Sequence, residues 1–145
     1  AVRQLQHQLG AEGMRILQTG YDEGDSDYDN PERYPVHSVA ITGTHDQHTA
    51  AGWFASASNT DRRRAMDAIG ATTPASYSRK LIDAGLKSHS RLFIAPLQDW
   101  LGLDDHARMN VPGTKRNNWS WRLPERTLAS RLAKTIRIAT RRAHR

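Results

Sequence analysis

Three short runs of apolar or β-prone residues occur along the chain, and each predicts a strand. They open the segments 14–21, 37–46 and 91–103. The second run breaks at Gly43 and the third stops at Pro96, because glycine and proline interrupt regular structure. The first run is mostly apolar, so we predict that it is buried.

Four other segments have hydrophobic residues at helical spacing. These helical segments are residues 1–13, 60–70, 74–88 and 126–143. In the first, Val2, Leu5 and Leu9 lie three and four positions apart, which predicts one apolar face. Pro74 suits the first turn of the third helix. The apolar stripe predicted for the last helix consists of Leu128, Leu132, Ile136, Ala139 and Ala143.

The order of these elements predicts an α/β protein. Short apolar strands that alternate with amphipathic helices are typical of parallel β/α units. Three strands are too few for a closed barrel, so we predict the C-terminal part of a (β/α)8 TIM barrel: about the last three strands, with their helices and long strand-end loops. Residues 1–145 would then belong to one barrel domain whose N-terminal part is missing. In support, the chain opens at Ala1 within a predicted helix that has no preceding N-cap residue.

Composition narrows the class of protein. The 145 residues fit one domain. No stretch approaches the roughly 18 apolar residues of a membrane span, so we predict no membrane partner and a cytoplasmic location. The absence of cysteine excludes disulfides and thiolate metal sites. An acidic loop at 22–32 lacks the glycine and closing glutamate of a calcium loop, which favours a solvated loop.

The positive charge is concentrated at one end. Net charge is +6, but residues 126–145 hold seven basic residues and no acidic one, which leaves 14 basic and 15 acidic residues before them. The basic segment 126–145, which contains the last predicted helix, and a loop at 107–123 favour one alternative function, a small basic nucleic-acid-binding module. The loop combines aromatic, amide and guanidinium side chains, which suit sugars or single-stranded nucleic acid. Its tryptophans, Trp119 and Trp121, are also candidates for core anchors.

The stretch GTHDQHT follows the second predicted strand and carries the strongest candidate chemistry. In parallel β/α folds the active site lies at the carboxyl ends of the strands, where His45 and Asp46 would project. A carboxylate there can hold sugar hydroxyls or face a developing positive charge. Two alternatives remain: a zinc site with His48, or an ordinary loop in which Asp46 caps the next helix.

Four segments together resemble one family. They are GMRILQ (13–18), YPVHSVAITGTHDQHTAAGWF (34–54), APLQDWLGL (95–103) and ARMNVPGTKRNNWSWRL (107–123). In this order they are similar to the C-terminal part of 4-alpha-glucanotransferase, also called amylomaltase or disproportionating enzyme, of the alpha-amylase clan. The resemblance spans about residues 10 to 140, nearly the whole chain.

The resemblance implies a transferase with three carboxylates in a catalytic (β/α)8 barrel. An Asp nucleophile and a Glu acid/base would transfer a 1,4-alpha-glucan segment to an acceptor 4-hydroxyl with retention. By the motif match, Asp46 is the third catalytic carboxylate, and His45 and Asn110 bind substrate. The implied partners are maltooligosaccharides and 1,4-alpha-glucans, with no metal, cofactor or nucleic acid. The other two carboxylates would lie upstream of Ala1, so we expect the fragment alone to be inactive.

The chain departs from the family pattern in two places. The family usually has GTHDNDT, so His48 replaces an acidic residue two positions after Asp46. The family's aromatic run after the preceding strand is here TGY, residues 19–21. We expect the histidine to change the loop locally or to alter its response to pH.

Overall fold

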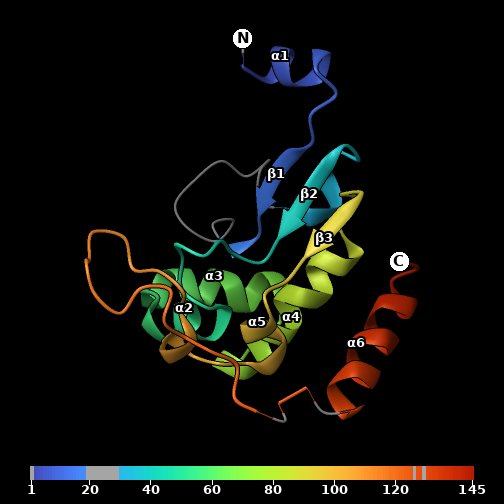
Figure 1. Ribbon diagram of the computed structural model, residues 1–145. Coiled ribbons are helices and arrows are strands. Elements are labelled where there is room, and N and C mark those ends of the chain that lie inside the picture. The colour runs from blue at the N-terminus through green and yellow to red at the C-terminus, as the bar shows by residue number, and fades with distance from the viewer. Residues whose placement is uncertain (1, 19–29, 126, 129) are drawn as a thin grey trace.

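A parallel three-stranded sheet forms the centre of the protein (Figure 1). The computed structural model describes residues 2–18, 30–125, 127–128 and 130–145. Within these, the strands are β1 (Gly13–Ile16), β2 (Ser38–Ile41) and β3 (Leu92–Ile94), in the spatial order β1-β2-β3. All three predicted strands and their parallel arrangement are therefore confirmed. The end of the first predicted run and most of the acidic loop lie outside the described residues.

The helices follow the strands in chain order. They are α1 (Val2–Gln8), α2 (Ala50–Ser56), α3 (Asn59–Ile69), α4 (Pro74–Lys87), α5 (Leu97–Leu101) and α6 (Ser130–Arg142), with the 3-10 turns η2 (Pro31–Arg33) and η3 (Asp105–Ala107). The sequence did not predict α2 or α5, because seven and five residues are too few to show a helical period. In the structure, capping residues mark the ends of these two helices. Thr49 caps α2, and Gly102 ends α5 with a left-handed backbone, φ 65°.

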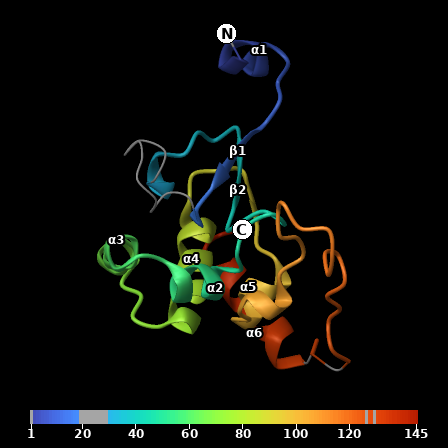
Figure 2. The same ribbon diagram turned by 90° about the vertical axis from the view of Figure 1, so that its left-hand side faces the viewer.

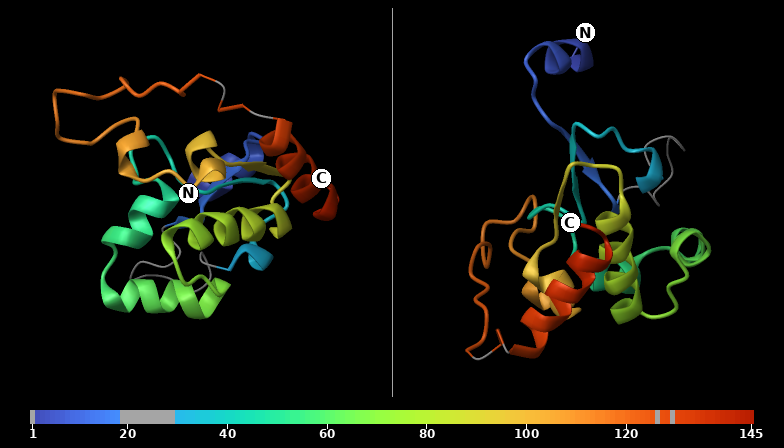
Figure 3. Two further views of the ribbon diagram at one scale, coloured as in Figure 1. Left: turned by 90° about the horizontal axis from the view of Figure 1, so that it is seen from below. Right: turned by 90° about the vertical axis from the view of Figure 1, so that its right-hand side faces the viewer.

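One face of the sheet is covered by helices. Side chains alternate between the two faces of a strand, and on this face Ser38, Ala40 and Thr42 are completely buried. Figure 3 shows α2, α3 and α4 on the same side of the sheet. Gly85 of α4 lies directly against the ring of Phe93, and a Cβ at position 85 would overlap that ring. A glycine is therefore needed where this helix crosses β3.

The opposite face is apolar and largely bare. The strand register aligns Met14 with Val39 and Leu92, and places Ile94 in the next row on the same face. Met14, Leu92 and Ile94 are 57%, 48% and 57% exposed. The prediction that the first strand is buried is thus wrong for Met14, because the described residues leave much of this face open.

The core lies between the sheet and helices α2 and α4. Tyr77 of α4 is fully buried, and its ring stacks on Trp53 at 5.0 Å and on Phe54 at 5.1 Å between centroids. The pair α2–α4 is accordingly packed through aromatic surface. Arg62 donates to the carbonyls of Phe54, Ala55 and Ala57, which closes the C-terminal end of α2.

The terminal helices pack less closely. The apolar side chains of α1, Val2, Leu5 and Leu9, are exposed, and Figure 2 shows α1 apart from the sheet. Helix α6 begins at Ser130, later than predicted, and has no buried residue among those described. None of the described helices combines the length and apolarity needed to cross a membrane.

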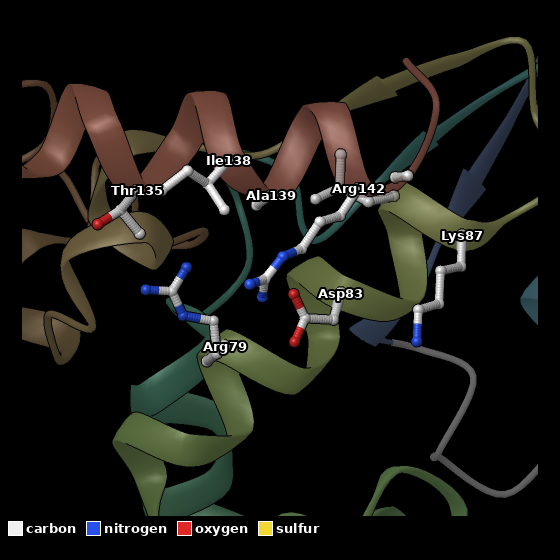
Figure 4. Close-up of a pocket in the computed structure, with 9 residues that line it drawn as sticks. Arg79, Asp83, Lys87, Thr135, Ile138, Ala139 and Arg142 are labelled. Carbon is white, nitrogen blue, oxygen red and sulfur yellow. The ribbon is translucent and has the colours of Figure 1, made fainter.

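Helices α4 and α6 enclose a hollow of about 510 Å³ (Figure 4). Arg79 and Asp83 of α4 and Arg142 of α6 line it. Beyond the C-terminal end of α6, Arg145 donates to the carbonyls of Leu86, Ser88 and Ser90. These contacts fix the end of the chain to the connection between α4 and β3. The hollow shares no lining residue with the loop that carries His45 and Asp46.

Candidate active site at the strand ends

The loop between β2 and α2 turns sharply and projects its central residue outward. The backbone N–H of Thr44 donates to Gln47 Oε1 at 2.8 Å, and that of Asp46 donates to Thr44 Oγ1 at 3.3 Å. Gln18, at the end of β1, donates from Nε2 to the carbonyl of His48 at 3.2 Å. The loop is therefore closed on itself and attached to the neighbouring strand end. The side chain of Asp46 remains 49% exposed.

The three residues predicted to form the site lie together. Asn110 Nδ2 donates to Asp46 Oδ1 at 2.6 Å, and His45 Nε2 lies 3.2 Å from the same oxygen. The backbone N–H of Asn110 also donates to the carbonyl of His45 at 3.2 Å. Residues 64 positions apart are thus brought into one cluster at the carboxyl end of β2. Their spacing in the sequence alone does not indicate this contact.

Two alternative explanations of the GTHD stretch do not fit the structure. The N-cap of α2 is Thr49, whose side chain accepts from the N–H of Gly52, so Asp46 does not cap the helix. A zinc site would need His48 beside Asp46, but His48 Nδ1 faces Asp105 Oδ2 at 2.5 Å instead. Among the residues that the structure describes, no group of three potential metal ligands occurs.

Arg108 joins the two loops of the cluster. Its Nη2 donates to the carbonyl of Asp46 at 2.7 Å, and its Nε donates to the carbonyl of Asn110 at 2.9 Å. The sequence placed Arg108 in the aromatic loop but gave it no role. Only the fold shows that one guanidinium spans both backbones, since the partner at position 46 is distant in sequence.

An aromatic side chain flanks the cluster. The ring of Trp119 lies 5.0 Å from that of His45 between centroids, tilted by 42°. Trp119 is 53% exposed, so the core-anchor hypothesis is wrong for this residue, whereas Trp121 is partly buried. Asn117 and Trp119 adopt left-handed backbone angles, φ 62° and 59°. This turn brings the indole back over the strand-end loop.

A buried carboxylate accepts hydrogen bonds from the residues on either side of the 43–49 loop. Asp99 of α5 is 4% exposed, and accepts from Thr42 Oγ1 at 2.5 Å and from the N–H of Ala50 at 2.8 Å. Burial is the main influence on this group and raises the pKa of Asp99, although both hydrogen bonds act in the opposite direction. Asp99 therefore joins the end of β2, the start of α2 and α5. The sequence analysis did not identify it.

A cavity of about 190 Å³ adjoins the cluster. It is lined by residues of the 43–49 loop, by Pro96, Gln98 and Asp99, and by the 107–109 segment. Pockets that hold a ligand the size of a drug molecule usually enclose about 300–1,000 Å³. The cavity formed by the described residues is therefore smaller than that range.

Comparison with known proteins identifies the family that the chain resembles. The model of the 4-alpha-glucanotransferase family matches residues 1–128. The 4-alpha-glucanotransferase of Thermus thermophilus is 37% identical over 129 residues, which cover 84% of this chain and 26% of the relative. The chloroplastic or amyloplastic 4-alpha-glucanotransferase of Arabidopsis thaliana is 35% identical over 126 residues, which cover 87% of this chain and 22% of the relative.

A solved structure matches over nearly the whole chain. It is an amylomaltase from Streptococcus agalactiae in complex with acarbose, with a TM-score of 0.89 and 26% identity, covering 99% of this chain and 29% of that one. The predicted α/β class and its assignment to part of such an enzyme are confirmed. The chain spans about a quarter of the length of the relatives it matches.

Proposed function

The chain belongs to the 4-alpha-glucanotransferase family, and from that premise we propose that it supplies one wall of a glucan-transferring active site. The observation that carries the proposal is the contact of Asp46 with His45 and Asn110 at the carboxyl end of β2. We assign Asp46 as the third catalytic carboxylate. His45 and Asn110 are the substrate-binding residues beside it.

The proposed reaction is retaining transfer by double displacement. A nucleophilic carboxylate and an acid/base carboxyl about 5 to 5.5 Å apart, supplied by other parts of the polypeptide, form and resolve a glycosyl-enzyme intermediate. In transfer, the 4-hydroxyl of an acceptor sugar attacks the intermediate in place of water. These steps use carboxyl groups alone, so the proposal includes no metal or cofactor.

Asp46 would contribute by binding the transition state more tightly than the substrate. The sugar ring flattens as positive charge develops at its anomeric carbon, and ring hydroxyls then move relative to a fixed carboxylate. Contacts that strengthen only at this point lower the barrier, whereas uniform binding does not. Asp46 is half exposed in this chain, so its oxygens are accessible to such hydroxyls.

The surroundings of Asp46 favour a carbohydrate partner. The exposed indole of Trp119 offers a flat apolar surface next to the polar groups of His45 and Asp46, a combination that matches a sugar's apolar face and hydroxyl rim. We propose maltooligosaccharides and 1,4-alpha-glucans as partners, and the cytoplasm as the location. The relatives reported above are all glucanotransferases or amylomaltases, so none supports the nucleic-acid-binding alternative.

The bare face of the sheet supports assigning residues 1–145 to the C-terminal portion of a single catalytic barrel. In a (β/α)8 barrel this face would point inward and be covered by the remaining strands. We predict that residues 1–145 alone do not transfer glucose and unfold without a cooperative transition, because exposed Met14, Leu92 and Ile94 leave an apolar surface in water. A sharp, cooperative melt followed by circular dichroism would contradict this domain assignment.

The function is tested with the complete polypeptide that contains this chain. Incubation with pure maltotriose should yield glucose, maltopentaose and longer 1,4-linked products, resolved by chromatography and mass spectrometry. A hydrolase would instead form maltose and glucose only. Formation of no product, or of hydrolysis products alone, would overturn the proposed function.

A further inference from the structure

We propose that Arg108 is a positioning residue that holds the Asp46 carboxylate in register with Asn110, and that the His48–Asp105 pair anchors the same loop at its other end. The inference rests on the proposed function, because its readout is the transfer reaction. It concerns residues that touch the backbone of the site and not the sugar.

The geometry of Arg108 supports a bridging role. Its guanidinium donates through Nη2 to the carbonyl of Asp46 at 2.7 Å and through Nε to that of Asn110 at 2.9 Å. A guanidinium is planar, and its N–H groups diverge in a fixed fork. The two carbonyls therefore have a set separation and orientation. The side chains on those backbones meet at 2.6 Å, between Asn110 Nδ2 and Asp46 Oδ1.

Such a bridge is needed because packing does not fix Asp46. Its side chain is 49% exposed, and its loop has no apolar residue between Gly43 and Ala50. A catalytic group must be held within about 0.5 Å of its productive position. A misplacement of about 1 Å can reduce the rate roughly a hundredfold. Hydrogen bonds, among them those from Arg108 and Asn110, provide this precision.

The second anchor is the carboxylate of Asp105. His48 Nδ1 lies 2.5 Å from Asp105 Oδ2 and 3.3 Å from Arg108 Nη1. A guanidinium can only donate and a carboxylate can only accept. The shorter contact decides the assignment: Nδ1 carries the proton and donates to Asp105. The other oxygen, Oδ1, accepts from the N–H of Thr49 at 3.1 Å.

Asp105 reaches this position because there is no side chain at Gly52. A Cβ at position 52 would overlap the carboxylate. The carboxylate thus binds two consecutive residues just before α2, while Arg108, three positions later, binds the middle of the loop. One short segment, η3 and the residue after it, clamps residues 46–49.

The pair also explains the departure at position 48. The resemblance implies an acidic residue there, and an acidic side chain in this structure would face the Asp105 carboxylate. Two carboxylates at hydrogen-bond distance repel when both are ionised. A histidine at position 48 is compatible with Asp105, so the two residues form a matched set in this chain.

The first experiment replaces Arg108 in the complete polypeptide. Arg108→Lys keeps the positive charge but loses the fork, so we expect kcat for maltotriose transfer to fall about 10- to 100-fold with KM changed less than about threefold. The matched control is Arg63→Lys, an exposed arginine of α3 outside the site, which should retain wild-type kcat. For Arg108→Ala, millimolar ethylguanidinium should restore part of kcat, an effect that a purely structural role does not predict.

The second experiment tests the anchor pair. His48→Asp should lower kcat, because a second carboxylate then faces Asp105, and the double variant His48→Asp with Asp105→Asn should recover most of the loss. A double variant no better than the single one would contradict the pairing.

The outcomes separate this inference from the function on which it rests. Wild-type protein that performs no transfer overturns both. Wild-type activity with normal kcat in Arg108→Lys, or a kcat loss in Arg108→Ala that ethylguanidinium leaves unchanged, overturns only the positioning role.

Discussion

The cluster of His45, Asp46 and Asn110 at the end of β2 and the helix-covered core beside β2 are stabilised by different kinds of interaction. In the core, side chains such as Ala40 and Tyr77 are completely buried and held by apolar contact. In the cluster, the side chains of His45 and Asp46 are about half exposed and held by directed hydrogen bonds from a distant loop. Only a few residues of chain separate the two environments, and Thr42, directly after β2, is the last fully buried residue before the cluster.

The contrast assigns different roles to the two regions. Exposed contacts such as that between His45 and Asp46 contribute little to folding, about 0 to 1 kcal/mol even where both groups are charged. Buried aromatic side chains contribute much more, through area removed from water and through ring contacts. Substitutions in the cluster should therefore change turnover and leave stability nearly unaltered. Substitutions in the core should do the reverse.

The largest expected effect is on turnover, in Asp46→Asn. The variant keeps the shape of the side chain but loses its charge, and loss of a contact of this kind costs about 3 to 4 kcal/mol or more. That corresponds to a fall in kcat of at least a hundred- to a thousandfold, about one order of magnitude per 1.4 kcal/mol. Maltotriose transfer measures kcat in the complete polypeptide, and thermal denaturation should show an unchanged midpoint.

A matched control separates the loss of this charge from the loss of any exposed carboxylate. Asp67 lies on the exposed surface of α3, and Asp67→Asn should keep wild-type turnover. Near-normal turnover in Asp46→Asn would remove Asp46 from the catalytic group. A large drop in its melting temperature would place Asp46 among residues that stabilise the fold, and the contrast between the two regions would fail.

The parts of the fold that the sequence predicted are those with long or strongly patterned signals. The three strands, α3 and α4 were predicted because their runs of apolar residues or their helical spacing are clear. Helices α2 and α5 depend on caps and on Asp99, whose contacts are made by residues about 50 positions away. A local pattern contains no information about such partners.

The next effect is on stability, in Tyr77→Leu. The variant removes stacking on Trp53 and Phe54, each contact contributing about 0.5 to 1.5 kcal/mol. We expect the free energy of unfolding to fall by about 1 to 3 kcal/mol, measured by chemical denaturation. The kcat of the folded fraction should be unchanged. Tyr77→Phe, which keeps the ring, is the control and should lose less; an equal loss would contradict stacking as the cause.

The candidate site was predictable in its residues but not in its arrangement. The motif match selected His45, Asp46 and Asn110, and the structure brings all three together. It could not select Arg108 or Asp105, because their role consists of backbone contacts that arise only when two loops meet. Trp119 was grouped with the loop, but its position over His45 depends on left-handed backbone angles at two residues other than glycine, which sequence patterns rarely indicate.

The smallest expected effect lies where the two regions meet, at Asp99. Because burial raises its pKa in the folded protein, the native state binds the proton more tightly than the unfolded chain, whose ordinary pKa is about 3.9. Stability from this group is therefore fully present below that unfolded value. It is lost as the pH rises through the folded pKa, the reverse of a salt-bridged aspartate.

Asp99→Asn removes this titration but keeps one acceptor for the N–H of Ala50. We expect the variant to match wild type within about 1 kcal/mol at low pH, because its amide N–H can donate to Thr42 Oγ1 as a protonated carboxyl does. The variant should become the more stable of the two as the pH rises above about 3.9, because only wild type then has to ionise a buried carboxyl. Denaturation curves at several pH values measure the difference. A difference that is constant with pH, or a wild type that gains stability relative to the variant as the pH rises, would mean that hydrogen bonds and not burial control the pKa of Asp99. Thr42 would then belong to the hydrogen-bonded cluster and not to the core.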